Sequence, residues 1–108
     1  MQVLKFGGTS VGSADNIRKV IEIVKGKIEK DDTIVVVSGL GGTTDALLNG
    51  GLLASQGNEQ YKNELQRIEQ RHLETVKQLI PVQQQSSMLS QVKKMCNEIE
   101  DICNGVFL

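Results

Sequence analysis

The sequence predicts an α/β fold, built on two parallel strands joined by a helix. Residues 2–6 and 33–37 have strand-like composition, and a segment with helical periodicity lies between them. Ten of the eleven glycines fall in residues 1–57, whereas residues 58–108 hold eight of the ten glutamines. The chain therefore divides into a loop-rich βαβ unit, residues 1–57, and a helical pair, residues 58–108.

The βαβ unit begins with a short strand at residues 2–6, which the glycines of residues 7–12 end. Ser13 can cap the following helix, whose apolar stripe consists of Ile17, Val20, Ile21, Val24 and Ile28. Residues 33–37 are almost wholly β-branched, which predicts a second strand buried on both faces. A right-handed crossover makes the strands parallel and places a ligand site beyond their carboxyl ends.

Helices account for the rest of the chain. One of Thr43, Thr44 and Asp45 can cap a helix that Gly50 and Gly51 make irregular. A longer helix is expected at residues 58–80, with an apolar stripe of Tyr61, Leu65, Ile68, His72, Val76 and Leu79. A last helix at about residues 87–104 carries Leu89, Val92, Cys96, Ile99 and Cys103, and residues 81–86 connect the two as an antiparallel pair.

Composition excludes several classes of function. The 12 basic and 13 acidic side chains leave a net charge of −1, which favours neither nucleic acid nor an anionic membrane as a partner. The longest apolar run, residues 34–37, is too short to span a bilayer, and no signal peptide precedes the first strand, so we expect a cytoplasmic protein. On a helix, Cys96 and Cys103 lie about 10 Å apart, which predicts reduced thiols, and no residues have the spacing of a metal site.

The first glycine-rich loop is the leading candidate for chemistry. Lys5 precedes two glycines and two hydroxyl residues, so backbone amides could hold an anion while the ammonium neutralises it. An ordinary strand lysine before a tight turn explains the same residues equally well. The first loop does not match the Walker phosphate-binding motif, because Ser13 and Ala14 stand where that motif has lysine and a hydroxyl residue. The second loop is a weak match to the dinucleotide-binding fingerprint, because Thr44 stands in place of its third glycine.

The string Lys5-Phe-Gly-Gly-Thr-Ser-Val-Gly12 resembles the N-terminal signature of aspartate kinases, a branch of the amino acid kinase family. Residues 35–45 resemble the second strand and following loop of that family. The resemblance implies a three-layer α/β/α sandwich, of which residues 1–108 would be the N-terminal portion. It also implies phosphoryl transfer from ATP to the side-chain carboxylate of L-aspartate, which gives 4-phospho-L-aspartate, the entry to lysine, threonine, methionine and isoleucine synthesis.

The same resemblance assigns individual residues. Lys5 would be catalytic and bind ATP phosphate together with Phe6, Gly7, Gly8, Thr9 and Ser10. Ser38 and Thr44 match positions that contact the aspartate substrate, and Gly41 and Gly42 would allow close backbone approach. Mg²⁺ would be held mainly by the ATP phosphates, with no protein ligand in this segment.

Downstream substrate, adenine-binding and regulatory segments of the family have no match here, so we expect a fragment that is inactive alone. Both a separate aspartate kinase and one fused to homoserine dehydrogenase fit the resemblance, and the full-length enzyme would be a homo-oligomer. Two other hypotheses stay open: another amino acid kinase with a different acceptor, and a non-catalytic association module.

Overall fold

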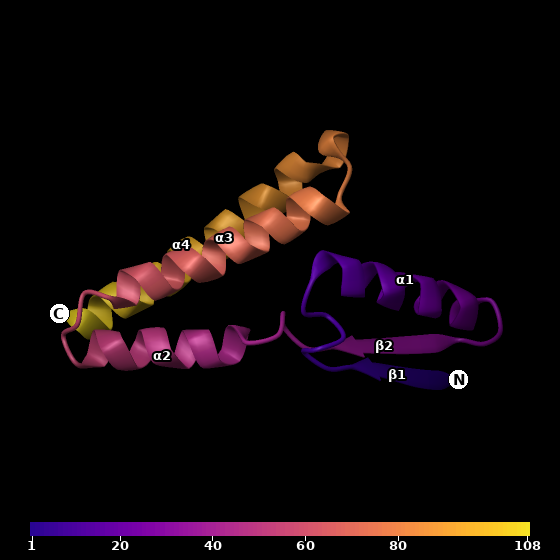
Figure 1. The fold of residues 1–108 in the computed structure, drawn as a ribbon, viewed down its shortest axis with the longest axis horizontal. Helices are drawn as coiled ribbons and strands as arrows, with labels where there is room; N and C mark the ends of the chain where they lie inside the picture. The colour runs from indigo at the N-terminus through magenta and orange to yellow at the C-terminus, as the bar shows by residue number, and fades with distance from the viewer. The chain divides into compact units, whose positions relative to one another are not determined.

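The computed structural model describes residues 1–108, which form two compact units, Met1–Gly42 and Thr43–Leu108. The elements in chain order are β1 (Gln2–Phe6), α1 (Ala14–Ile28), β2 (Thr33–Val37), α2 (Thr43–Ser55), α3 (Tyr61–Leu79), a 3₁₀ turn (Val82–Gln84) and α4 (Gln85–Phe107) (Figure 1). The predicted α/β class is therefore confirmed. The boundary between the units differs from the expected one at Gly57, because α2 packs on α3 and α4.

The first unit is the expected strand–helix–strand arrangement. Strands β1 and β2 pair in parallel (Figure 1). In their register Gln2 lies opposite Thr33 and Phe6 opposite Val37. At the start of the two strands, the Gln2 side-chain amide donates a hydrogen bond to Thr33 Oγ1 at 2.9 Å and so links β1 to β2. Ser13 caps α1 as predicted, and its Oγ accepts the Asn16 amide at 3.2 Å.

Strand β2 is more exposed than its composition predicts. The side chains of Ile34, Val35, Val36 and Val37 are between 39% and 56% exposed, so the expectation of burial on both faces was wrong. The register puts Val3, Ile34 and Val36 on one face of the two-stranded sheet. Within Met1–Gly42 the only helix is α1, and one helix cannot cover both faces of a sheet.

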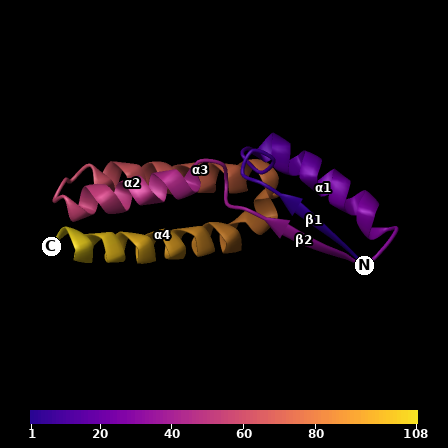
Figure 2. The same cartoon turned by 90° about the horizontal axis from the view of Figure 1, so that it is seen from below.

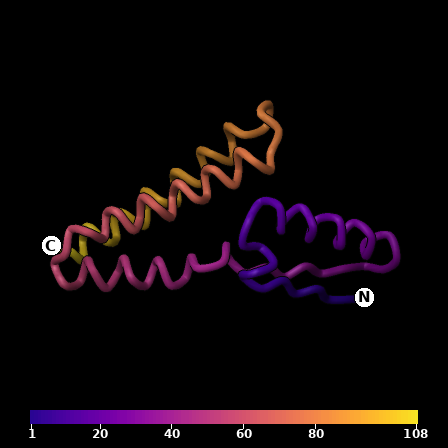
Figure 3. Tube along the Cα trace, in the orientation of Figure 1, coloured from indigo at the N-terminus to yellow at the C-terminus, as the bar shows by residue number.

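The second unit is a three-helix arrangement. Helices α3 and α4 run antiparallel and side by side, and α2 contacts both (Figures 2 and 3). Its core cluster joins Ala54, Tyr61 and Cys103, which are all buried. Tyr61, 1% exposed, donates its hydroxyl to Asn104 Oδ1 at 2.5 Å, and its ring lies 5.3 Å from that of Phe107. The predicted apolar stripes of the helical pair therefore do form its core.

Several helix boundaries differ from the expected ones. Helix α2 starts at Thr43 and continues through Gly50 and Gly51, so these glycines do not make it irregular. Helix α3 starts at Tyr61, and α4 extends beyond its predicted range at both ends. The Gln85 side chain, at the start of α4, donates to the Ile80 carbonyl at 2.7 Å and so satisfies a carbonyl group at the end of α3.

Cys96 is half-buried and Cys103 is buried, and the structure joins neither of them in a disulfide. None of the helices combines the length and the apolar composition that a membrane crossing requires.

Candidate functional site

The candidate site lies at the carboxyl ends of β1 and β2, within the first unit. Lys5 is exposed near the end of β1, and no ion pair or hydrogen bond engages its ammonium group. The Ser38 amide donates to the Phe6 carbonyl at 3.1 Å and so extends the strand pairing by one residue. The structure therefore brings Lys5, the glycine-rich loop and Ser38 to the same end of the sheet.

The carbonyl groups of the first loop are held by contacts within the chain. Gly7 O accepts the Val11 amide at 3.2 Å. Thr9 O accepts the Gly12 amide at 3.2 Å and the Asn16 side-chain amide at 3.1 Å. Every peptide bond is trans, so the N–H group on each of these peptide planes points away from its carbonyl. The amides of Gly8 and Ser10 are therefore directed away from the groups that hold the loop.

The peptide between Gly8 and Thr9 is oriented by packing instead. A Cβ atom built on Gly41 would stand 2.8 Å from Gly8 O, and one built on Gly12 would stand 3.1 Å from it. These two glycines enclose the Gly8 carbonyl and turn the Thr9 amide away from them. The amides of Gly8, Thr9 and Ser10 donate no hydrogen bond within the chain. Successive amides of this kind, before a helix N-terminus, are typical of an anion-binding loop.

A hollow of about 300 Å³ adjoins this loop. Its lining combines the hydroxyl residues Thr9 and Ser10 with apolar and polar side chains, namely Phe6, Asn16, Lys19, Val20 and Ile23. Lys19 therefore brings a second cation close to the loop, and sequence reasoning missed it. The signal was present, because Lys19 and Asn16 are three residues apart and so share one side of α1.

The expected substrate residues fall in different units. Ser38 lies beside the first loop: its Oγ would be 3.6 Å from a Cβ atom built on Gly8. Thr44 is exposed in the first turn of α2, in the second unit. The neighbouring Thr43 was expected only as a possible helix cap, but it is the first residue of α2 and its hydroxyl oxygen is buried without a hydrogen-bond partner. An unpaired buried hydroxyl next to Gly42, whose φ is 83°, is an unusual feature for a helix start.

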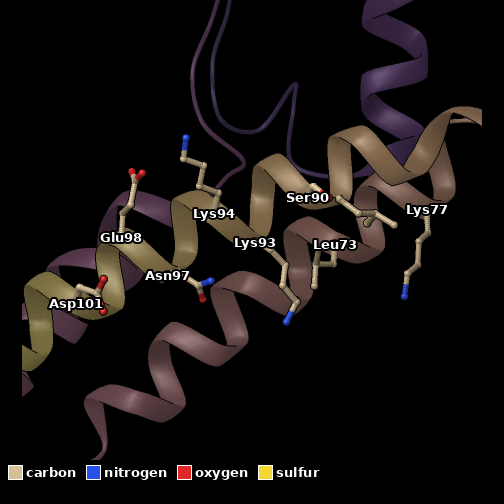
Figure 4. A pocket seen from close by; sticks show the side chains of 9 residues that line it. Leu73, Lys77, Ser90, Lys93, Lys94, Asn97, Glu98 and Asp101 are labelled. Carbon is tan, nitrogen blue, oxygen red and sulfur yellow. The ribbon is translucent and has the colours of Figure 1, made fainter.

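The remaining candidates fit structural roles. His72 is half-buried and its Nδ1 lies 2.7 Å from the Ile68 carbonyl oxygen, in keeping with the packing role expected of it. A surface hollow of about 680 Å³ on α3 and α4 carries charges of both signs (Figure 4), including Lys77, Lys93, Lys94, Glu98 and Asp101. Lys93 pairs with Glu69 at 3.2 Å, and the mixture of charges favours no single ionic ligand. No three acidic, histidine or cysteine side chains lie together as a metal site would need.

A family model decides the relationship that the loop suggests. The model of the amino acid kinase family matches residues 1–103, almost the whole chain. The chain belongs to the amino acid kinase family. Curated relatives agree: the "Aspartokinase" of Geobacillus stearothermophilus is 46% identical over 68 residues, which are 61% of this chain and 16% of that protein. The chain thus aligns with a small part of a longer amino acid kinase.

Two further relatives point to the same branch of the amino acid kinase family. The "Aspartokinase" of Mycobacterium tuberculosis (strain ATCC 25618 / H37Rv) is 52% identical over 48 residues, 44% of this chain and 11% of that protein. "Aspartokinase 1, chloroplastic" of Arabidopsis thaliana is 35% identical over 80 residues, 71% of this chain and 14% of that protein. The parallel β1–β2 pair with α1 between its strands is consistent with the N-terminal part of an amino acid kinase fold.

Proposed function

We propose that this chain supplies the phosphate-binding strand and loops of an aspartate kinase. The enzyme transfers the ATP γ-phosphoryl group to the side-chain carboxylate of L-aspartate and produces 4-phospho-L-aspartate and ADP. The observation that carries this proposal is the row of amides at Gly8, Thr9 and Ser10, which follows the strand that carries the unpaired Lys5. The names of the curated relatives support aspartate as the acceptor.

In the proposed reaction, an oxygen of the aspartate carboxylate forms a bond to the γ-phosphorus. The bond from that phosphorus to the bridging oxygen breaks, and the electron pair leaves with ADP. Lys5 and the three loop amides stabilise the negative charge on the phosphoryl oxygens, which is where phosphoryl transfer needs electrostatic help. Residues of this segment therefore position and neutralise the phosphoryl group.

The side chains of Ser38 and Thr44 are proposed to bind L-aspartate through their hydroxyl groups, which can donate to a carboxylate. For Ser38 this bond would replace the one that its hydroxyl donates to the Gly39 carbonyl at 3.1 Å. Phe6 and Gly7 would complete the nucleotide segment. Mg²⁺ is proposed to arrive on the ATP phosphates and to neutralise part of their charge. The chain itself offers no cluster of three ligand side chains for the ion.

Calorimetric titration of the 108-residue chain with Mg-ATP and with L-aspartate tests the proposal. We expect saturable Mg-ATP binding that is lost in Lys5→Ala, because that variant lacks the cation beside the loop. Lys30→Ala is the matched control, since Lys30 is also exposed but follows α1, at the opposite end of the strands. Equal binding by Lys5→Ala and the parent chain would contradict the role of Lys5.

A chimera addresses catalysis, because the curated relatives are much longer than this chain. Residues 1–42 would replace the aligned segment of the Geobacillus stearothermophilus aspartokinase, and aspartyl phosphate would be trapped as its hydroxamate. Lys5→Ala in the chimera should lower kcat by about 10²- to 10³-fold, the usual effect of removing one group that stabilises transition-state charge. The 108-residue chain alone should form no aspartyl phosphate.

A second candidate function, non-catalytic association, is favoured by one observation. Val3, Ile34 and Val36 are 61%, 47% and 45% exposed and share a sheet face with Lys5, so three exposed apolar side chains lie beside one lysine on a surface that could pack against a partner. Sedimentation at several dilutions distinguishes the two. A concentration-dependent mass without nucleotide binding would favour association, whereas a monomer that binds Mg-ATP would favour the kinase segment.

A further inference from the structure

Two residues outside the first glycine-rich loop contact carbonyl groups of that loop. Asn16, in the first turn of α1, donates its side-chain amide to Thr9 O at 3.1 Å. Gly41, in the second glycine-rich loop, packs its backbone against Gly8: a Cβ atom built on it would stand 2.8 Å from Gly8 O and 3.3 Å from Gly8 C. The same two peptide planes carry the amides of Ser10 and Thr9. Each contact therefore sets the direction of one amide of the anion-binding row.

Glycine is required at position 41 because of space. Real Cβ atoms essentially never approach a carbonyl oxygen to 2.8 Å, so any side chain there must push the two loops apart. Gly41 also lies next to Gly12, at 3.7 Å from its built Cβ to Gly12 Cα. Three stretches of backbone thus meet without an intervening side chain, and the position of one depends on the other two.

Other glycines of the same loops lack this constraint. A Cβ atom built on Gly7 or on Gly39 meets nothing within 4 Å, and neither residue has a positive φ. Composition alone cannot tell Gly39 from Gly41, although the two lie in one loop and are separated by Leu40. The chain therefore provides an internal control for the effect of adding a methyl group at this loop.

We propose that Asn16 and Gly41 are positioning residues for the phosphate-binding loop: they hold the Thr9 and Gly8 carbonyls and thereby aim the Ser10 and Thr9 amides at the phosphate. This inference rests on the proposed function for the identity of the anion, but the positioning itself is a property of the chain without ligand. The role proposed for both residues is to hold the loop and requires no contact of their own with the phosphate. Each acts through a peptide plane of the loop.

Nuclear magnetic resonance of the ¹⁵N-labelled 108-residue chain tests the positioning. In the parent, the order parameters of the Gly8, Thr9 and Ser10 amides should be near the value of rigid backbone, about 0.85. Gly41→Ala should lower the value at Thr9, and Asn16→Ala the value at Ser10, toward about 0.6. Gly39→Ala should leave all three unchanged, because its added methyl group enters open space.

Ser13→Ala is the control for Asn16→Ala. It removes the cap of α1, in which Ser13 Oγ accepts the Asn16 backbone amide, but retains the Asn16 side chain on Thr9 O. An effect of Asn16→Ala that arises only from a weakened helix start should therefore appear in Ser13→Ala as well. Asn16→Ala adds no atoms at the loop contact, so it keeps the inference testable even if Gly41→Ala does not fold.

Titration with Mg-ATP, and separately with inorganic pyrophosphate, gives the second readout. The Kd of Asn16→Ala should rise about threefold to tenfold for both ligands, the range expected for the loss of one hydrogen bond that orients a donor. Pyrophosphate isolates the phosphate contacts from those of the nucleoside.

The outcomes separate this inference from the proposed function. Lower order parameters in both variants, with weaker ligand binding than in the two controls, would support both. Unchanged order parameters at Thr9 and Ser10, or unchanged Kd values, would overturn the inference. If the order parameters fall in Gly41→Ala and Asn16→Ala while the parent chain binds neither ligand, the result would support the positioning and count against the phosphate-binding role.

Discussion

Substitution Tyr61→Phe should measurably destabilise the helical unit, because it removes one hydroxyl group from the most buried large side chain of the chain. That hydroxyl donates to Asn104 Oδ1 at 2.5 Å, whereas the ring contact with Phe107 survives the change. A single hydrogen bond contributes about 0.5–1.5 kcal/mol net to the free energy of unfolding. For a unit of this size, 1 kcal/mol corresponds to a fall in Tm of about 4–8 °C.

The assay is thermal unfolding followed by circular dichroism at 222 nm, since the chain has no tryptophan and Tyr61 is its only tyrosine. A double-mutant cycle with Asn104→Ala isolates the pair. If the hydrogen bond contributes as described, the two substitutions together should cost about 1 kcal/mol less than their sum. Asn97→Ala is the matched control, because Asn97 is exposed on the same helix.

Additivity within about 0.3 kcal/mol would refute the reasoning, because independent residues behave in that way. A Tyr61→Phe variant as stable as the parent would refute it as well. The control cycle of Tyr61→Phe with Asn97→Ala should be additive in either case. The comparison therefore separates a specific contact between α3 and α4 from a general effect of altering α4.

Two other expectations follow from the helical unit. Gly51→Ala should raise the free energy of unfolding by about 0.5–1 kcal/mol in urea titrations, because its Cβ atom meets nothing within 4 Å and alanine favours a helix over glycine; a lower midpoint would contradict this. Burial, and then the nearby Glu69 carboxylate, raise the pKa of the Cys96 thiol above its usual value, while Lys93 lowers it less. The protonated thiol is thus favoured on folding, and any stability this confers is present below the unfolded thiol pKa and lost as pH rises through the folded one. Peptide mapping after iodoacetamide treatment at pH 8 should show slower alkylation of Cys96 in the folded chain than in urea, and equal rates would contradict the raised pKa.

Local patterns predicted the elements well because their signals are short-range. The β-branched run of Thr33–Val37, the Ser13 cap and the apolar stripe of α3 each depend on residues a few positions apart. Helix α2 shows the limit of this reasoning. Two glycines suggested an interruption, but Gly50 packs against α3, where a built Cβ lies 3.5 Å from Leu65 Cδ2, and the packing maintains the helix.

Burial was harder to predict than secondary structure. An apolar composition says that a strand can be buried, but the layer that covers it is set by the number of elements in the unit. In Met1–Gly42 one helix accompanies two strands, and Ile34 and Val36 therefore stay exposed. The division at Gly42 was missed for a similar reason, since the contacts of α2 with α3 and α4 are long-range.

The candidate site shows the same contrast between local and distant information. The loop composition indicated amides that could hold an anion. The structure shows which carbonyl groups of the loop are held by hydrogen bonds or by packing. The contribution of Asn16 could not be read from its type, because asparagine near a helix start is also common as a cap. The separate requirements of Gly39 and Gly41 depend on a neighbouring loop more than 25 residues away.

The backbone contact of Gly41 with Gly8 leads to an expectation for saturation mutagenesis. Because the first side-chain atom already meets the carbonyl, all nineteen replacements at position 41 incur the same initial clash, whatever their charge or polarity. Fitness scores at this position should form a flat profile in which alanine is nearly as harmful as tryptophan. At position 39 the scores should be graded, with small residues close to the parent. A mutational scan would thus separate a glycine chosen for space from one that is merely tolerated, without a ligand or an assay of the chemistry.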